Sequence, residues 1–337
     1  MMRVWQWLIG LLIGWSITPI HSARAAELMQ DVRLQVSIIT CGPGQDLYSV
    51  YGHSAVRIID STRGTDKVYN YGTFDFSDPE FYWKFTRGKL LYYLSLESYE
   101  GFVQNYDREG RSMYEQVLNL NQSDALAIQN FLETNALPEN KYYRYDFLFD
   151  NCSTRIRDIF PKLMGERFSY GVAMSDDSLS FRELLDVYER NIHWERFGIN
   201  LLLSSTVDRR MKGYESMFLP DYLQKGFHGA QLDGRPLVKQ TLQVLPSRVP
   251  FSTESNAPRR MGWILLFALI LASISPVTRR FMVFFDVFWF LALGLLGVFM
   301  IFMWLGTEHT VCAFNLNLFW AVPTHIILAY WIGRDHS

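Results

Sequence analysis

The chain has few cysteines and no strong excess of charge, and both shortages exclude classes of protein. Its 337 residues contain three cysteines, Cys41, Cys152 and Cys312, too few for a disulfide framework or a zinc site. The histidines also lack metal-ligand spacing, so we expect no metal and no cofactor. The formal net charge is -2 and no basic run is present, which excludes nucleic acid as a partner.

What the chain has instead is apolar sequence, gathered at its two ends. Arg3 is followed by an apolar run over residues 4–20 and by Ala23-Arg24-Ala25, which has the small-x-small form of a cleavage site. The run is short for a membrane span. We predict a cleaved signal peptide over residues 1–25 and an exported segment after it, with an uncleaved anchor as the alternative.

Three more apolar segments close the chain, at residues 261–277, 281–305 and 318–332. Each is bounded by charged or polar groups, so we predict three transmembrane helices within residues 261–337. Residues 246–260 are rich in Pro, Ser and polar side chains, as is typical of a linker. The exported domain then spans residues 26–245.

The exported domain mixes strands and helices. Apolar and polar residues alternate over residues 31–40, which predicts a half-buried strand. Further strands are expected at residues 55–59, 67–74, 89–96 and 112–120. Helices are expected at residues 78–88, 99–109, 123–135, 180–190 and 221–230. This mixture indicates an α+β fold.

The strongest chemical signal is the stretch Asp150-Asn151-Cys152-Ser153-Thr154-Arg155. An aromatic run ends at Asp150-Asn151 and a segment with helical spacing follows, so Asp or Asn caps a helix whose first turn contains Cys152. The free N–H groups and the positive end of the helix dipole favour a thiolate there, as in cysteine nucleophiles. Pro161 is expected to kink or end this helix early.

A cysteine nucleophile needs a base, and His53 at the start of a predicted strand is the candidate. A strand histidine facing a helix-start cysteine is the papain-like arrangement, here with the histidine first, as in circularly permuted members of that fold. Asn70 on the next strand is predicted to orient the imidazole through its side-chain oxygen. Backbone N–H groups at Cys152 and Ser153 are predicted to bind an oxyanion.

Two plainer interpretations stay open at this point. Cys41 and Cys152 can pair as a structural disulfide, which would make the chain a non-enzymatic binding module tethered to the membrane. His53 can equally be a structural histidine, and Asn70 a turn cap.

Several segments together resemble a known family. They are Leu47–Arg57, Tyr69–Phe76, Tyr145–Arg155, Met217–Pro220 and the tail loop from His309 to Asn317. As a set they are similar to the Lnb-type bacterial lipoprotein N-acyltransferases, also called lipoprotein intramolecular transacylases. The three-segment tail also resembles that family.

This resemblance implies a circularly permuted papain-like (NlpC/P60-related) periplasmic domain on the bacterial inner membrane, with Cys152 and His53 as the catalytic pair. Other side chains in the matching segments are expected to bind substrate or an oxyanion: Ser153, Tyr48, Tyr71, Asp150, Asn151, Arg155 and His309.

The implied reaction is N-acylation of the N-terminal cysteine of bacterial lipoproteins through a thioester on Cys152. A membrane glycerolipid or the lipoprotein's own diacylglyceryl group is the expected acyl donor. The apolar tail suits this reaction, because donor and acceptor both lie in the bilayer. The alternative enzyme is a cysteine hydrolase of peptidoglycan peptides or phospholipid esters, with water as the acceptor.

Overall fold

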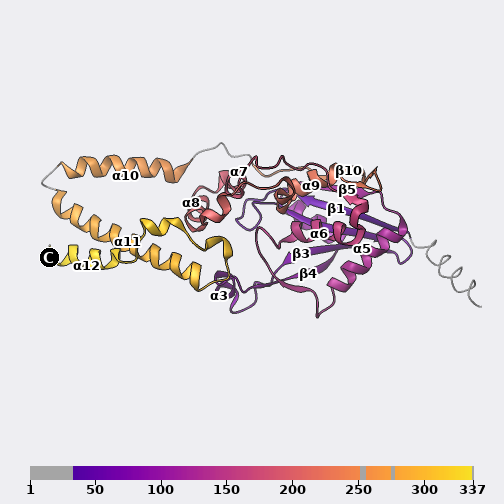
Figure 1. Cartoon of the computed structure of the whole chain (residues 1–337), viewed down its shortest axis with the longest axis horizontal. Coiled ribbons are helices and arrows are strands. Elements are labelled where there is room, and N and C mark those ends of the chain that lie inside the picture. Colours follow the sequence, from indigo (N-terminus) through magenta and orange to yellow (C-terminus); the bar gives the residue numbers. More distant parts are fainter. Residues whose placement is uncertain (1–32, 251–255, 275–277, 336–337) are drawn as a thin grey trace, which may run out of the picture.

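The computed structural model describes residues 33–250, 256–274 and 278–335, so the predicted signal peptide lies outside the described residues. A domain built on a β-sheet occupies one end of the molecule, and the apolar helices of the tail extend away from it at the other end (Figure 1). The short helices α3, α7 and α8 lie between the two parts in this view.

The main sheet of the described residues has seven strands in the order β10-β5-β1-β2-β3-β4-β6, and every neighbouring pair is antiparallel. Its strands are β1 Leu34–Cys41, β2 His53–Asp60, β3 Thr65–Thr73, β4 Leu91–Ser98, β5 Met113–Leu118, β6 Tyr142–Arg144 and β10 Val238–Leu245. A small second sheet joins β7 Phe168–Ser169, β8 Gln231–Leu232 and β9 Arg235–Pro236. The five predicted strands are confirmed as β1 to β5, whereas β6 and β10 of the same sheet were not predicted.

Helices cover both faces of the main sheet. On one face, α5 (Gln122–Asn135), α6 (Cys152–Met164) and α9 (Pro220–His228) enclose the largest apolar core. On the other face, α4 (Tyr99–Arg108) buries Ile39, Cys41 and their neighbours. The prediction that the first strand is half-buried is therefore wrong. Its apolar residues do alternate, but α4 covers the face that was expected to meet water.

The remaining helices of the sheet domain are short. They are α3 Phe81–Thr86, α7 Phe181–Tyr188 and α8 His193–Leu202, with 3-10 turns η1 Gly165–Arg167, η2 Glu189–Asn191, η3 Ser205–Asp208 and η4 Gly213–Phe218. The helix expected from residue 180 is α7, and a capping box of Ser180 and Glu183 starts it.

Pro161 does not end α6, which continues to Met164. A proline removes the hydrogen bond to the carbonyl four residues earlier, here that of Arg157. The Tyr170 hydroxyl donates to this carbonyl at 2.8 Å and replaces the lost bond. A partner outside the helix therefore overrides the local rule.

The tail consists of α10 (Ala257–Ser273), α11 (Arg279–Leu305) and α12 (His325–Asp335), with 3-10 turns η6 Thr310–Cys312 and η7 Leu316–Phe319. In the described part of the chain one helix, Arg280–Leu305, is long and apolar enough to cross a membrane. The third predicted span starts too early, because η7 and a turn occupy residues up to 324 and the α-helix begins only at His325.

The loop after α11 is hydrogen-bonded to the sheet domain in two places. Beside α3, the Glu308 N–H donates to the Arg87 carbonyl at 2.9 Å and His309 Nε2 lies 3.1 Å from the Phe85 carbonyl. At the end of α8, the Asn315 and Asn317 side chains donate to the Leu201 carbonyl at 2.7 and 3.0 Å. These bonds fix the tail loop against the sheet domain.

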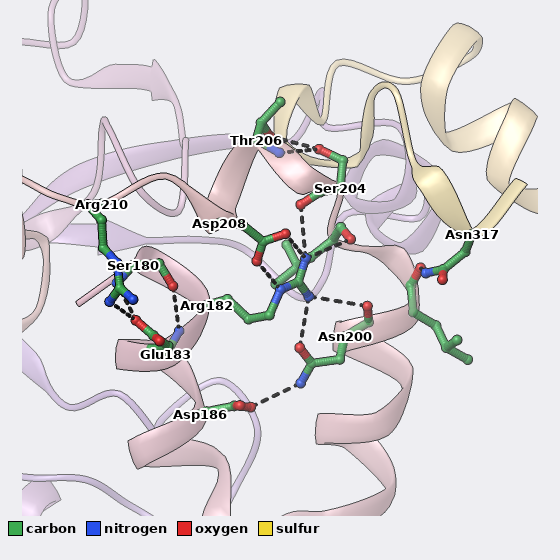
Figure 2. A network of polar contacts seen from close by, with 12 residues as sticks. Ser180, Arg182, Glu183, Asp186, Asn200, Ser204, Thr206, Asp208, Arg210 and Asn317 are labelled. Carbon is green, nitrogen blue, oxygen red and sulfur yellow. Dashed lines mark hydrogen bonds and ion pairs between the residues drawn. The ribbon is translucent and has the colours of Figure 1, made fainter. Parts of the chain in front are cut away.

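Figure 2 shows the polar network that holds the end of α8 in place. Arg182 of α7 donates to Asp208 Oδ1 at 2.6 Å and to the Ser204 carbonyl at 2.9 Å. It also donates to Asn200 Oδ1 at 2.8 Å, and Asn200 in turn donates to Asp186. One partly buried guanidinium thus joins α7, α8 and η3 beside the point where the tail docks.

Candidate active site

Cys152 is the first residue of α6, and Asn151 caps the helix as the sequence predicts. Asn151 Oδ1 accepts from the N–H groups of Ser153 at 2.8 Å and Thr154 at 2.9 Å. Its Nδ2 donates to the Phe218 carbonyl at 2.9 Å, within the Met217–Pro220 segment that the sequence singled out. Asn151 and this segment therefore fix the start of the helix, and with it the position of the thiol.

The capping bonds correct one expectation. The Ser153 N–H was predicted to bind an oxyanion, but it already donates to Asn151. The Ser153 side chain is buried and lies 3.0 Å from Ser54 Oγ and 3.9 Å from Cys152 Sγ. No hydrogen bond of the Cys152 N–H is present among the described residues, so that group is the helix-start donor that remains for an oxyanion.

His53 begins β2, directly after Gly52, whose φ of 82° and close approach to the Cys41 carbonyl leave no room for a side chain. His53 Nε2 lies 2.6 Å from Asn70 Oδ1, and Asn70 Nδ2 donates to Glu97 Oε1 at 2.6 Å. A carboxylate only accepts, so Glu97 fixes which end of the Asn70 amide faces the histidine. His53 therefore donates from Nε2, and Nδ1 is left for Cys152.

Cys152 and His53 favour the ion pair of a thiolate and an imidazolium. Burial opposes ionisation of Cys152, but the His53 charge and hydrogen bonds from His53, the Ser54 N–H and Ser153 together lower the pKa of the thiol. Burial likewise opposes protonation of His53, but the Cys152 thiolate and Asn70 raise its pKa. The arrangement can therefore attack a carbonyl carbon with the thiolate and then deliver a proton from the imidazolium.

Asp150, Arg155 and Tyr71 lie in a second group beside the cysteine. Arg155 donates from Nε to Asp150 Oδ1 at 2.6 Å and from Nη2 to Oδ2 at 2.8 Å. Its guanidinium carbon lies 3.5 Å above the ring centroid of Tyr143 and 5.7 Å from that of Tyr71. The carboxylate thus holds the guanidinium over the two tyrosine rings.

Two predicted site residues lie outside the hydrogen-bonded group formed by Cys152, His53 and Asn70. Tyr48 is 63% exposed, and His309 belongs to the loop that docks on α3. No hydrogen bond or ring contact joins either of them to Cys152 or His53 in the described part of the chain. The sequence could not show this, because it gives the residue types of a loop but not where the loop docks.

Sequence reasoning missed four residues that surround Cys152 and His53. Glu97 orients Asn70, the Ser54 N–H reaches the thiol, Tyr106 stacks on His53 with ring centroids 6.5 Å apart, and Tyr143 lies under Arg155. Only Glu97 had a visible signal, since it alternates with Ser95 on the strand that follows the Asn70 strand. Tyr143 comes from a strand of three residues, too short to show a pattern.

The structure contradicts the disulfide interpretation, because all three cysteines are free thiols. Cys41 lies on β1 directly opposite His53, on the face that α4 covers. Burial raises the pKa of Cys41, so it is a neutral core thiol and not a second nucleophile. In the described residues no cluster of three or more His, Cys, Asp or Glu side chains is arranged to hold a metal ion.

Two family models match the chain. One describes the Lnb N-terminal periplasmic domain and matches residues 24–186, and the other describes the Lnb transmembrane domain and matches residues 251–337. The chain belongs to the Lnb family. No curated protein and no solved structure matches it.

Membership of the Lnb family makes this chain a membrane protein with a periplasmic N-terminal domain, consistent with an enzyme that modifies lipoproteins. The match to the periplasmic domain includes Cys152, His53 and Asn70. The name of the transmembrane model counts five transmembrane helices, against the three predicted from this sequence.

Proposed function

We propose that this Lnb protein is a thiol-dependent acyltransferase that N-acylates the N-terminal cysteine of bacterial lipoproteins through a thioester on Cys152. One observation carries the proposal: a helix-start cysteine with a lowered pKa meets a histidine that Asn70 holds at 2.6 Å. A buried structural cysteine needs no charged partner, and it needs no neighbouring histidine that is held in one tautomer.

In the first half-reaction the Cys152 thiolate attacks an ester carbonyl, and a C–S bond forms as the carbonyl oxygen takes the negative charge. The tetrahedral intermediate collapses, the C–O bond of the ester breaks, and imidazolium His53 gives its proton to the departing alkoxide. The products are an alcohol and an acyl thioester on Cys152. His53 is then neutral and ready to accept a proton.

In the second half-reaction the free amine of a lipoprotein's N-terminal cysteine attacks the thioester. His53 takes a proton from the attacking nitrogen, the C–S bond breaks, and an amide forms while the Cys152 thiolate is restored. The acyl donor is a glycerolipid or the lipoprotein's own diacylglyceryl group. Both substrates are lipid-anchored, which suits an enzyme whose catalytic domain is hydrogen-bonded to a membrane tail.

The domain assignment belongs to the same proposal. We assign residues 1–25 to a signal peptide, 26–245 to a periplasmic permuted papain-like domain, 246–260 to a linker and 261–337 to a multi-pass inner-membrane domain. An antiparallel sheet with the histidine and asparagine on adjacent strands and the cysteine on a helix packed against them supports the papain-like assignment.

The test compares Cys152→Ala with Cys312→Ala in cells that depend on this protein, with mass spectrometry of lipoprotein N-termini as the readout. Cys312 is a buried thiol in the tail loop and serves as a matched control. We expect Cys152→Ala to abolish N-acylation and Cys312→Ala to retain it. Unchanged N-acylation in Cys152→Ala would refute the proposal.

A covalent adduct distinguishes the transferase from a hydrolase. Incubation of the full-length detergent-solubilised protein with phospholipid or diacylglyceryl lipopeptide, and no free amine, should leave an acyl mass on the peptide that carries Cys152. Rapid release of free fatty acid without a longer-lived adduct would favour the hydrolase.

A further inference from the structure

Tyr143 has a buried hydroxyl without a partner. It is the central residue of β6, with its neighbours exposed and its own side chain 7% exposed. Among the described residues no group accepts from or donates to its Oη. An unpaired buried hydroxyl costs about 1–3 kcal/mol, so a fold retains one where a partner arrives later or where the group has another use.

The hydroxyl lies close to the catalytic pair, as the space around Gly72 shows. Gly72 has a φ of 93°, and a Cβ built on it would lie 3.7 Å from Cys152 Cβ, 3.7 Å from His53 Cε1 and 4.0 Å from Tyr143 Oη. A carbon atom at that point would be in ordinary van der Waals contact with all three groups. Cys152, His53 and the Tyr143 hydroxyl therefore lie around the same side of Gly72, and the missing side chain leaves that side uncovered.

The tyrosine is held rigidly, as a preorganised donor must be. The Arg155 guanidinium covers one face of its ring and is itself fixed by two bonds to Asp150. Tyr71 packs edge-on against the same ring, with centroids 6.2 Å apart. Burial and the nearby Cys152 charge raise the pKa of Tyr143, so its hydroxyl keeps its proton at neutral pH and can donate.

We propose that Tyr143 is a catalytic residue whose Oη–H donates a hydrogen bond to the oxyanion formed when Cys152 attacks an acyl carbonyl. The Cys152 N–H is the second donor, because the Ser153 N–H already donates to the Asn151 side chain that caps the helix. The phenol keeps its proton throughout, and the bond is lost when the carbonyl re-forms. Asp150 and Arg155 are positioning residues in this scheme. The inference rests on the proposed acyl transfer at Cys152.

The test is Tyr143→Phe in the full-length protein, measured in two reactions of the same thiol. Acylation of Cys152 by a lipid ester passes through an oxyanion, and loss of one donor should slow it by about 10²- to 10³-fold. Alkylation of Cys152 by iodoacetamide forms no oxyanion, so its rate should not change. Tyr92→Phe removes a hydroxyl from the residue directly opposite on β4 and is the matched control; it should leave both rates unchanged.

Each outcome decides one question. Equal slowing of acylation and alkylation would show that Tyr143 supports the thiolate or the fold, and would overturn the inference. Acylation of Tyr143→Phe at the wild-type rate would overturn it too, while the proposed function stands. Persistent acylation in Cys152→Ala would instead refute the proposed function itself.

Discussion

Two regions of this molecule place a histidine near asparagines, and only one of them assembles a reactive group. At the start of the central strand β2, His53 bonds to the Asn70 side chain and faces the Cys152 thiol. In the tail loop, His309 bonds to the Phe85 backbone carbonyl, while Asn315 and Asn317 bond to the backbone at the end of α8. Because a backbone carbonyl does not ionise, the second region gains attachment but no chemistry.

The largest expected effect separates the two histidines. His53→Ala should slow acylation of Cys152 by about 10²- to 10⁴-fold, because it removes the general acid and base. His309→Ala should leave iodoacetamide alkylation of Cys152 unchanged, because no ionisable group of the site contacts it. Single-turnover acylation and alkylation rates of both variants check this. An equal fall in the acylation rate of Cys152 in His53→Ala and His309→Ala would remove the distinction between the two regions.

Next in size is the hydroxyl that supports the helix carrying the thiol. Tyr170→Phe leaves the Arg157 carbonyl without the bond that replaces the one missing at Pro161. We expect the free energy of unfolding to fall by about 1–3 kcal/mol. Thermal unfolding in detergent measures it. A double variant that also changes Pro161 to Ala should recover part of the loss, since the amide bond to Arg157 can then form.

Asn70→Ala sharpens the comparison through pH. Asn70 raises the pKa of His53, so its removal lowers that pKa, and the imidazolium is lost at a lower pH. The alkaline limb of the pH–rate profile for Cys152 acylation should therefore move to lower pH. The rate at the optimum should fall by about tenfold, the equivalent of one hydrogen bond of about 1.4 kcal/mol. An unmoved alkaline limb would contradict the orienting role of Asn70.

The smallest effect is expected at the docking loop. Glu308 pairs with Arg144 and lies 3.9 Å from Lys89, and all three side chains are at least one-third exposed. Exposed ion pairs contribute about 1 kcal/mol or less. Glu308→Gln should therefore lower the unfolding temperature slightly and leave acylation unchanged. Arg182→Ala should lower the unfolding temperature more, because it removes a partly buried guanidinium with several acceptors. A larger fall in the unfolding temperature of Glu308→Gln than of Arg182→Ala would contradict this prediction.

Local patterns predicted much of the site because its key geometry is local. A helix cap involves residues within one turn, so Asn151 and Cys152 were readable from adjacent positions. His53 and Asn70 lie on strands that are consecutive in the chain and adjacent in the sheet, so the order of the strands was enough to suggest that they meet. The same reasoning failed for Pro161, whose effect depends on Tyr170, and for the third apolar segment, whose α-helix begins only at His325.

The sequence by itself therefore predicted Cys152, His53 and Asn70 as the candidate nucleophile, base and orienting residue, and it determined the apolar character of the tail. Only the tertiary structure decided which donors face the thiol, because those choices join residues far apart in the chain. The Ser153 N–H already donates to Asn151, and Glu97 fixes the orientation of the Asn70 amide. The pairing of β6 with β4 brings Tyr143 close to Cys152. Non-local pairing depends on the register of whole strands, which no short stretch of sequence encodes.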